Sequence, residues 1–373
     1  MMTLFYNQYQ VKNIYELDTP ALVVFPEIVK RNIQQIVGVI DDVTRLRPHI
    51  KTHKCAEVIK LLQSSGIQQF KCATIAEAEL LGMCLAEDVL LAYQPNEAKL
   101  LRLIQLIKQY PKTQFSCLVD SVAVAEMMVE ILEKHQLKLD VFIDLNVGMN
   151  RTGILPEKAF DLFMNLQKMS SLQIIGLHAY DGHIHEVDFL ERTKSCHNAF
   201  EPVWKLLQSL DSQGFTELKL IAGGSPTFPI LAKNERVECS PGTFVFWDKG
   251  YQDSMPEQPY EIATLVISRI ISLPEPHKIC LDLGHKSIAS ENELSHRVYF
   301  PEIPEAKFVG HSEEYLVLDV GENHSYQIGD IFYGFPIHIC PTVALYERLY
   351  VVENQALTGN EWKIIARDKK IYI

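Results

Sequence analysis

A dense basic cluster, RLRPHIKTHK, spans residues 45–54 and closes a short strand-like run. It contains two arginines, two histidines and two lysines, and this concentration of positive charge suits an anionic ligand. Neighbouring cations lower the pKa of a lysine, which frees its amine for Schiff-base chemistry, and Lys51 stands in the middle of the cluster. An exposed, charge-rich loop is the alternative. Pro48 and the internal position of the cluster favour a shaped site.

Two further strand-like runs end in side chains that could contact such a ligand. DLNVGMNRTGI leads into a Gly-containing turn with Arg151 at its tip, and a guanidinium can donate to phosphate, carboxylate or phenolate oxygens. GLHAYDGHIH contains Tyr180, whose ring could lie against a planar cofactor. On a strand, His183 and His185 would face the same side, as a metal-binding pair could. The alternatives are that Arg151 lies on a purely structural turn and that the two histidines bind no metal.

Two glycine- and hydroxyl-containing turns could bind a phosphate. IAGGSPTF includes Gly224 and Ser225, and CSPGTFVF includes Gly242 and Thr243. Backbone N–H groups and hydroxyls in such turns cradle anions, and two of them after neighbouring strands are typical of barrel phosphate sites. Either turn alone would be only a turn.

The segment PIHICPTV (336–343) brings an imidazole and a thiol close together in the sequence. On a strand, His338 and Cys340 would point the same way, and imidazole with thiolate is a zinc-type ligand pair. Two protein ligands would leave room for a substrate or water. From the residues alone, a buried core pair is the simpler interpretation.

The elements that must position these residues alternate regularly between about residues 44 and 247. Eight short apolar runs, each typical of a buried parallel strand, alternate with longer segments of helical periodicity. This pattern predicts a (β/α)8 barrel of TIM type, in which strand ends converge on one mouth. A doubly wound sheet is the alternative, but no glycine-rich fingerprint follows the first strand. We therefore predict a barrel domain over residues 20–247.

The pattern of apolar and polar residues changes from about residue 255, where strand-like runs follow one another with turns between them. This pattern predicts a mostly-β domain over residues 248–373, joined by residues 1–19. The early run PALVVF (20–25) could belong to either domain.

Composition excludes several classes of protein. The chain of 373 residues carries a formal net charge of −12 and no run of basic residues that would form a basic face for nucleic acid, which argues against a nucleic-acid partner. No segment has the length and apolarity of a membrane span, and the N-terminus does not resemble a signal peptide. Eight scattered cysteines without a CxxC pair indicate free thiols, so we expect a cytoplasmic protein without a membrane partner.

Taken together, these segments resemble the D-threonine aldolase and D-serine dehydratase family, which shares the alanine racemase-like fold type III of pyridoxal 5′-phosphate (PLP) enzymes. The resemblance runs nearly end to end, and the RPHIKTHK and HICPTV segments are its most specific parts. The other matching segments are LDTPALVV (17–24), CATIAEAELL (72–81), NRTG (150–153), GLHAYDGH (176–183), AGGSPT (222–227) and PGTFVFWD (241–248).

The resemblance implies a PLP-binding barrel, a C-terminal β domain and a role for each candidate residue. Lys51 would bind PLP as a Schiff base and act in catalysis, Arg151 would lie near the phenolic oxygen, and Tyr180 beside the ring. The phosphate would be held by Gly224, Ser225, Gly242 and Thr243. A divalent metal, zinc or manganese, would be bound by His338 and Cys340, which reverses the simpler interpretation given above. The strand near residues 20–25 would join the small domain, and the protein would be a homodimer.

The resemblance also implies an activity, with alternatives. The expected reaction is PLP- and metal-dependent retro-aldol cleavage of a D-3-hydroxy amino acid, as of D-threonine, to glycine and an aldehyde. A D-serine dehydratase, which forms a 2-oxo acid and ammonia, is the first alternative, because the His-x-Cys pair is closer to its pattern. An amino-acid racemase and a non-catalytic PLP carrier are the others. Ser240 departs from the arginine that relatives carry before the PG of the PGT segment, facing the pyridine nitrogen.

Overall fold

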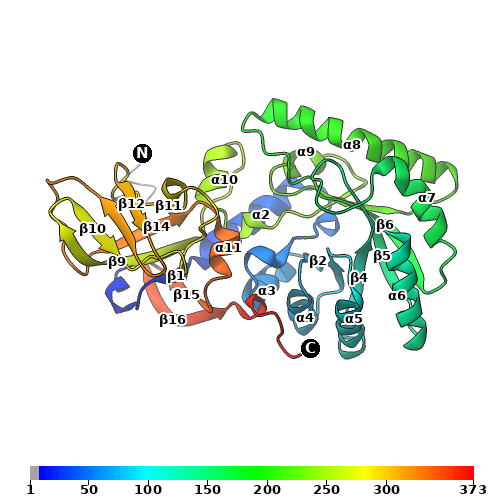
Figure 1. Cartoon of the computed structure of the whole chain (residues 1–373), viewed down its shortest axis with the longest axis horizontal. Helices are drawn as coiled ribbons and strands as arrows, with labels where there is room; N and C mark the ends of the chain where they lie inside the picture. The colour runs from blue at the N-terminus through cyan, green and yellow to red at the C-terminus, as the bar shows by residue number, and fades with distance from the viewer. Residues whose placement is uncertain (1–7) are drawn as a thin grey trace. The chain divides into compact units, whose positions relative to one another are not determined.

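The computed structural model describes residues 8–373, which divide into two compact units (Figure 1). Unit 1 combines the N-terminal segment up to Gln35 with Thr52–Val58 and Thr243–Arg367. Unit 2 combines Ile36–Lys51, Ile59–Gly242 and Asp368–Ile373. Each unit therefore draws on segments that are far apart in the sequence.

Unit 2 is built on a seven-stranded parallel sheet whose strands follow one another in sequence order. The strands are β2 (Gln69–Cys72), β3 (Asp88–Leu91), β4 (Gln114–Val119), β5 (Leu139–Leu145), β6 (Leu172–Ala179), β7 (Lys219–Ala222) and β8 (Val237–Cys239). The helices between them are α4 (Ile75–Met83), α5 (Glu97–Gln109), α6 (Val122–Lys134), α7 (Pro156–Leu166), α8 (Phe189–Ser212) and α9 (Phe228–Leu231). Helices α4 to α8 lie outside the curved sheet (Figure 1). The strand–helix alternation that the sequence predicts is thus confirmed.

The eighth barrel position is filled by an irregular segment, where the sequence predicts a strand. Residues 43–45 form a short 3-10 turn, η2 (Val43–Arg45). Beyond it, Leu46 forms an isolated parallel bridge with Cys239, and His49 forms one with Lys71. Pro48 lies between these bridges and has no N–H to donate, so a regular ladder cannot continue through it. The segment still lies between β8 and β2 and closes the ring of strands.

The start of α4 shows how the sequence sets one helix of this ring. Thr74 is the N-cap, and its hydroxyl accepts from the N–H of Glu77 at 3.1 Å. The carboxylate of Glu77 reaches back to the N–H of Ala73 at 2.6 Å, which completes a reciprocal cap. Glu79, two residues further along, accepts from the backbone of Tyr372 and holds the C-terminal segment in unit 2.

The interior of the barrel is packed with apolar side chains from β3, β4, β5 and β7. Leu90, Leu118, Phe142 and Ile221 form a buried cluster. Gly176 on β6 is required by this packing, because a Cβ there would lie 2.7 Å from the ring of Phe142. In barrels with a filled interior, ligands bind at the strand ends.

Unit 1 is mostly β, as the sequence predicts. Its nine-stranded sheet has the order β12-β13-β10-β9-β1-β15-β16, with β14 paired to β9 and β11 to β14. The strands are β1 (Ala21–Val24), β9 (Thr264–Glu275), β10 (Lys278–Leu281), β11 (Val298–Tyr299), β12 (Lys307–His311), β13 (Leu316–Asp319), β14 (Ile331–Pro336), β15 (Arg348–Glu353) and β16 (Ala356–Lys363). The early run PALVVF supplies β1, which pairs with β9 and β15.

The remaining helices are α2 (Pro26–Val39), α3 (Ala56–Ser64), α10 (Lys249–Ser254) and α11 (Ile339–Val343). The prediction that a strand continues through residues 336–343 is wrong, because β14 stops at Pro336 and α11 follows. Pro341 lies in the first turn of α11, where its missing N–H costs nothing. All eight cysteines are free thiols.

Candidate active site

A cavity of about 590 Å³ lies within unit 2, at the carboxyl ends of the parallel strands. Lys51, Arg151 and Tyr180 line it, so three of the predicted site residues lie around one space. Its volume is in the range typical of pockets for small ligands. The position follows from the barrel, whose strand ends converge on one mouth.

Tyr180 is the point around which the basic groups are arranged. The guanidinium carbon of Arg151 lies 5.0 Å from the centre of the tyrosine ring, and the Nζ atom of Lys51 lies 5.7 Å from it. Lys51 belongs to the 3-10 turn η3 (Ile50–Thr52), and its N–H donates to Nδ1 of His49 at 3.2 Å. The cavity therefore presents an amine and a guanidinium beside an aromatic ring.

The turn that carries Arg151 is fixed by its own hydrogen bonds. The Oδ1 atom of Asn146 accepts from the N–H groups of Gly148 and Asn150, at 3.1 and 3.0 Å. Gly148 has φ +126°, and a Cβ there would lie 2.5 Å from Nε2 of His183. Glycine is therefore required at this position by both backbone conformation and close approach.

Gly224, Ser225, Gly242 and Thr243, the residues predicted to hold a phosphate, do not line this cavity. The N–H of Gly224 donates to Oδ1 of Asp181 at 3.3 Å, and Ser225 is buried. A Cβ on Gly242 would lie 2.5 Å from the carbonyl oxygen of His49, so glycine is needed there for close backbone approach. Thr243 begins the short turn η4 (Thr243–Val245) in unit 1.

The structure shows a chain of buried, hydrogen-bonded polar side chains that we did not predict from the sequence. The Nδ1 atom of His178 is 2.7 Å from Oδ1 of Asp144, and Nε2 of the same ring is 3.5 Å from Nζ of Lys71. Lys71 also donates to the hydroxyl of Ser240. Lys71, His178 and Asp144 line the same cavity as Lys51. The available signal was a polar residue among apolar ones near the carboxyl end of each strand: QFKC in β2, FIDL in β5 and GLHA in β6.

The surroundings perturb the titration of each member of this chain. Burial, and next the charge of Lys51, lower the pKa of Lys71 to about 7. Burial also lowers the pKa of His178, against the hydrogen bond to Asp144. Burial would raise the pKa of Asp144, but the hydrogen bond and charge of His178 outweigh it and hold that pKa below its usual value. The neutral imidazole therefore donates from Nδ1 to Asp144 and accepts at Nε2.

The sequence predicts that the basic cluster of residues 45–54 forms one anion site, and this prediction is wrong. Arg45 donates to backbone carbonyl groups of Val237 and Ala232. Arg47 is fully buried and pairs with Asp88 and Glu238. Successive residues of an extended segment face opposite sides, so the cluster is divided among different surroundings. Of its basic residues, His49 and Lys51 line the cavity.

The histidine of the KTHK sequence lies in unit 1. His53 is buried, its ring centre lies 6.3 Å from that of Phe246, and burial lowers its pKa to about 3. It is therefore a neutral core residue.

His338 and Cys340 lie close together in unit 1, at the start of α11, with His338 as the N-cap. The Nδ1 atom of His338 is 2.5 Å from Oε1 of Glu291, which leaves Nε2 for another partner. The thiol of Cys340 is 3.1 Å from the hydroxyl of Thr52 and 3.7 Å from that of Thr243. Among residues 8–373, no group of three or more His, Cys, Asp or Glu side chains forms a metal-binding cluster.

The donor types of this pair fit a metal such as zinc, which prefers nitrogen and sulfur ligands. Two protein ligands would leave the other positions to substrate or water. A carboxylate on the outer imidazole nitrogen is the arrangement that orients metal-binding histidines. Partial desolvation lowers the pKa of His338, but the hydrogen bond and charge of Cys340, with Glu291 and Asp248, outweigh it and raise that pKa to about 9.

His183 and His185 are the other candidate metal pair, and their two imidazole rings have different surroundings. The Nδ1 atom of His185 is 2.7 Å from the carbonyl oxygen of His183, and the ring of His183 lies against Gly148.

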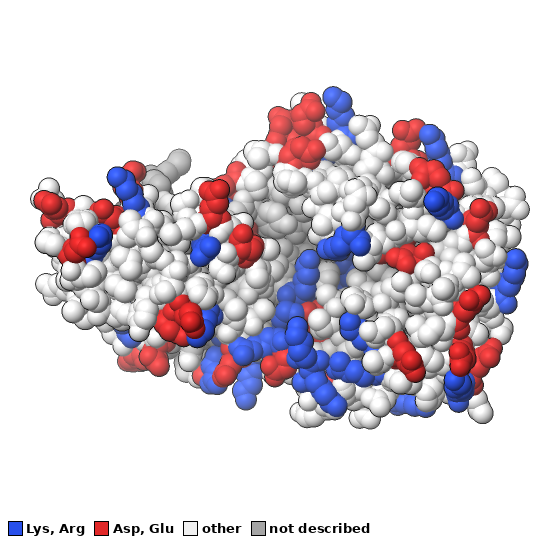
Figure 2. Space-filling view, viewed as in Figure 1, with Lys and Arg blue, Asp and Glu red and all other residues white. Residues whose placement is uncertain are grey.

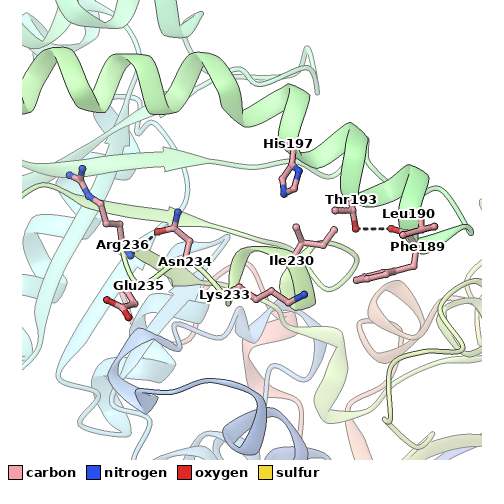
Figure 3. A pocket seen from close by; sticks show the side chains of 9 residues that line it. All are labelled: Phe189, Leu190, Thr193, His197, Ile230, Lys233, Asn234, Glu235 and Arg236. Atoms are coloured by element: carbon pink, nitrogen blue, oxygen red, sulfur yellow. Dashed lines mark hydrogen bonds between the residues drawn. The ribbon is translucent and has the colours of Figure 1, made fainter.

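A second hollow, of about 730 Å³, lies on the outer surface of unit 2 between α8 and the segment from α9 to β8 (Figure 3). Figure 3 shows Phe189 and Arg236 at opposite ends of it, so its side chains do not converge on one point. The hydroxyl of Thr193 is bonded to the carbonyl of Phe189 at 2.7 Å, and Leu190 is 76% exposed. This hollow lacks the convergent chemistry of the cavity around Tyr180.

On the face of unit 2 shown in Figure 2, acidic and basic side chains are interspersed. None of the helices in the described part of the chain is long and apolar enough to cross a membrane.

Comparison with known proteins defines the class. Residues 26–249 match the family described as "Alanine racemase, N-terminal domain", and residues 263–352 match a "Putative serine dehydratase domain". The first match covers more than half of the chain, so the protein belongs to the alanine racemase-like family. The combination of the two domains, with relatives named D-threonine aldolase and D-serine dehydratase, makes the chain similar to these two kinds of enzyme within the family.

Curated relatives are similar over nearly their whole length. A D-threonine aldolase of Arthrobacter sp is 25% identical over 360 residues, which is 94% of this chain and 93% of the relative. A 3-hydroxy-D-aspartate aldolase of Paracoccus denitrificans (strain Pd 1222) is 25% identical, covering 95% and 93%. A D-serine dehydratase of Dictyostelium discoideum is 22% identical, covering 94% and 97%. The chain is therefore related to both aldolases and dehydratases.

Solved structures share the fold. A D-threonine aldolase from Filomicrobium marinum superposes with a TM-score of 0.87 at 23% identity, covering 95% of this chain and 96% of the other. A D-threo-3-hydroxyaspartate dehydratase, described as a cysteine-to-alanine mutant in the metal-free form, gives 0.81 at 19% identity, covering 94% and 98%. A histidine-to-alanine mutant of that dehydratase, substituted two positions earlier, gives 0.78 at 19% identity, covering 97% and 98%.

Proposed function

We propose that the protein is a PLP- and divalent-metal-dependent lyase that cleaves D-3-hydroxy amino acids such as D-threonine to glycine and an aldehyde. The observation that carries the proposal is the convergence of Lys51, Arg151 and Tyr180 on one cavity at the mouth of the barrel. This donor set fits PLP: an amine suits its aldehyde, a guanidinium its anionic oxygen, and an aromatic ring its flat face.

In this proposal, each residue has a defined task. Lys51 holds the cofactor covalently through its amine and, once released by the substrate amine, can accept or return a proton. Arg151 neutralises the phenolic oxygen, and Tyr180 fixes the plane of the ring. The turns at Gly224–Ser225 and Gly242–Thr243 hold the phosphate. PLP itself supplies an electron sink for the bond that breaks at the substrate's α-carbon.

His338 and Cys340 are proposed to hold the metal, with Glu291 orienting the imidazole. A metal in this position would act as a Lewis acid that lowers the pKa of the substrate's 3-hydroxyl. The histidine-to-alanine and cysteine-to-alanine substitutions described for the dehydratase structures are also two residues apart, which supports a metal role for such a pair.

A dehydratase acting on D-serine or a related 3-hydroxy amino acid is the second candidate. The His-x-Cys pair favours it, because histidine and cysteine at this spacing are the residues substituted in the dehydratase structures. In that reaction, Lys51 would remove the α-proton and the hydroxyl would leave as water. Hydrolysis of the released enamine would then give ammonia and a 2-oxo acid.

The test is to incubate the protein, loaded with PLP and metal, with D-threonine and to identify the products, with a chelator and L-threonine as controls. Glycine and acetaldehyde, formed from the D isomer and abolished by the chelator, are expected. Ammonia and 2-oxobutanoate would establish the dehydratase instead. If PLP binds and D-threonine yields neither pair of products, the lyase proposal is wrong.

A further inference from the structure

The buried end of the cavity in unit 2 is formed by a lysine that the proposed mechanism does not use. Lys71 is 3% exposed, and its partners His178, Asp144 and Ser240 are 4, 5 and 4% exposed. Lys51, by contrast, is partly exposed and Arg151 is exposed. The cavity thus has an open end with Arg151 and an enclosed end with Lys71.

A buried lysine at this depth needs a reason. Within the described residues, its Nζ atom bonds to the hydroxyl of Ser240 and to Nε2 of His178, and no carboxylate forms an ion pair with it. Burying an ammonium without a paired charge is costly, and such groups concentrate at functional sites. The position of the Lys71 amine is also fixed by its neighbours, because Asp144 holds His178 in the tautomer that accepts from Lys71.

The hydrogen-bond count leaves one donor for a ligand. In its ammonium form Lys71 has three N–H groups, and two of them go to Ser240 and His178. Lys71 lines the cavity, and its Nζ atom lies 5.7 Å from the centre of the Tyr180 ring, the same distance as that of Lys51. The third N–H can therefore meet a ring lying beside Tyr180.

The chemistry of PLP says which of its atoms this donor would meet. The ring nitrogen lies directly across the ring from the carbon that bears the aldehyde. With the aldehyde joined to Lys51, the nitrogen points away from Lys51, and the enclosed end of the cavity offers Lys71 as its donor. This step rests on the proposed function, in which Lys51 holds PLP.

We propose that Lys71, positioned by Ser240 and by the His178–Asp144 pair, donates a hydrogen bond to the ring nitrogen of PLP. Lys71 lies on β2 and places a cation at this end of the cavity, held there by its contact with Ser240. A nitrogen that accepts from a cation keeps its lone pair and stays unprotonated. The ring then withdraws electrons less strongly than a pyridinium would.

The test compares PLP with its 1-deaza analogue, in which carbon replaces the ring nitrogen. The dissociation constant of each is measured by absorbance titration of the cofactor-free protein. The wild-type protein is expected to bind PLP at least about tenfold more tightly than the analogue, as for a hydrogen bond involving a charged group. In Lys71→Met this preference should fall to within about threefold. Lys134→Met is the matched control, because the Lys134 side chain on α6 is exposed, and this variant should keep the full preference.

A further measurement on the wild-type protein also tests the inference. Wild-type protein loaded with ring-15N PLP should show the nitrogen shift of an unprotonated, hydrogen-bonded pyridine, which needs no variant. A pyridinium shift, or an equal preference for PLP in wild type and Lys71→Met, would overturn the assignment of Lys71 while leaving Lys51 in place. Absence of any PLP binding by the wild type would overturn the proposed function and this inference together.

Discussion

The closure of the barrel depends on one buried arginine, and its removal should be costly. Arg47 is 0% exposed and donates two hydrogen bonds to the Asp88 carboxylate, at 2.7 and 2.8 Å. It also donates to Glu238 at 2.8 Å and to Gln69 at 2.7 Å. These contacts fix the segment that leads to Lys51 against the starts of β2 and β3.

Arg47→Met would leave two carboxylates facing one another with little solvent, since the Asp88 and Glu238 side chains are 16 and 12% exposed. Removing one partner of a buried pair costs about 3–5 kcal/mol. Lys219 lies 3.6 Å from Asp88 and 3.3 Å from Glu238 and compensates in part, so we expect about 3 kcal/mol, the lower end of that range.

The assay is urea denaturation, with hydrogen exchange of peptides from β2 and β3 to locate the loss in unit 2. Arg236→Met is the control, because Arg236 also makes a two-fold contact with a carboxylate, that of Asp211, but its side chain is 42% exposed. An exposed pair of this kind contributes about 0–1 kcal/mol. If Arg47→Met costs no more than Arg236→Met, the account of barrel closure is refuted.

The loss should also depend on pH. Burial would raise the pKa of Asp88, but the hydrogen bonds and charge of Arg47 outweigh it and hold that pKa below its usual value. A lowered carboxyl pKa stabilises the folded state above the unfolded pKa of about 3.9, and the contribution is lost as pH falls through the folded pKa. The difference between wild type and Arg47→Met should therefore be full at pH 7 and shrink below about pH 4.

Three further changes test the site. Lys51→Ala should retain no PLP absorbance after desalting; full occupancy in this variant would contradict the assignment of the lysine. Glu291→Ala should weaken metal binding about 10–100-fold, measured against a chelating dye, because the carboxylate orients His338. An unchanged affinity would show that Glu291 has no such role. Gly148→Ala should lower the thermal midpoint more than Gly214→Ala, because both have positive φ but only Gly148 is in close contact with a side chain. Equal losses would show that backbone strain alone matters.

Much of the fold could be predicted because periodicity reports directly on burial. The strands and helices from β2 to β8 occupy the runs that show it, and the convergence of Lys51, Arg151 and Tyr180 follows from barrel geometry. The change of texture near residue 255 likewise marks the mostly-β part of unit 1.

What the sequence could not show was how side chains with the same charge divide between sites. Arg47 and Lys51 lie four residues apart in one basic cluster, yet Arg47 closes the barrel and Lys51 lines the cavity. The structural role of Arg47 depends on Asp88 and Glu238, which are distant in sequence. Lys71 was missed for a similar reason, because its partners come from other strands.

Local rules also competed with the larger pattern. The apolar run through HICPTV reads as a continuing strand, but Pro341 favours the first turn of a helix, and α11 forms there. The segment before Lys51 reads as a strand as well, yet Pro48 interrupts its ladder.

The central claim is that Lys51 holds PLP in the barrel cavity, and chemical trapping tests it most directly. The PLP-loaded protein is reduced with borohydride, digested, and mapped by mass spectrometry. We expect a single phosphopyridoxyl adduct, on the peptide containing Lys51. An adduct on Lys71 or on another lysine, with Lys51 unmodified, would contradict it.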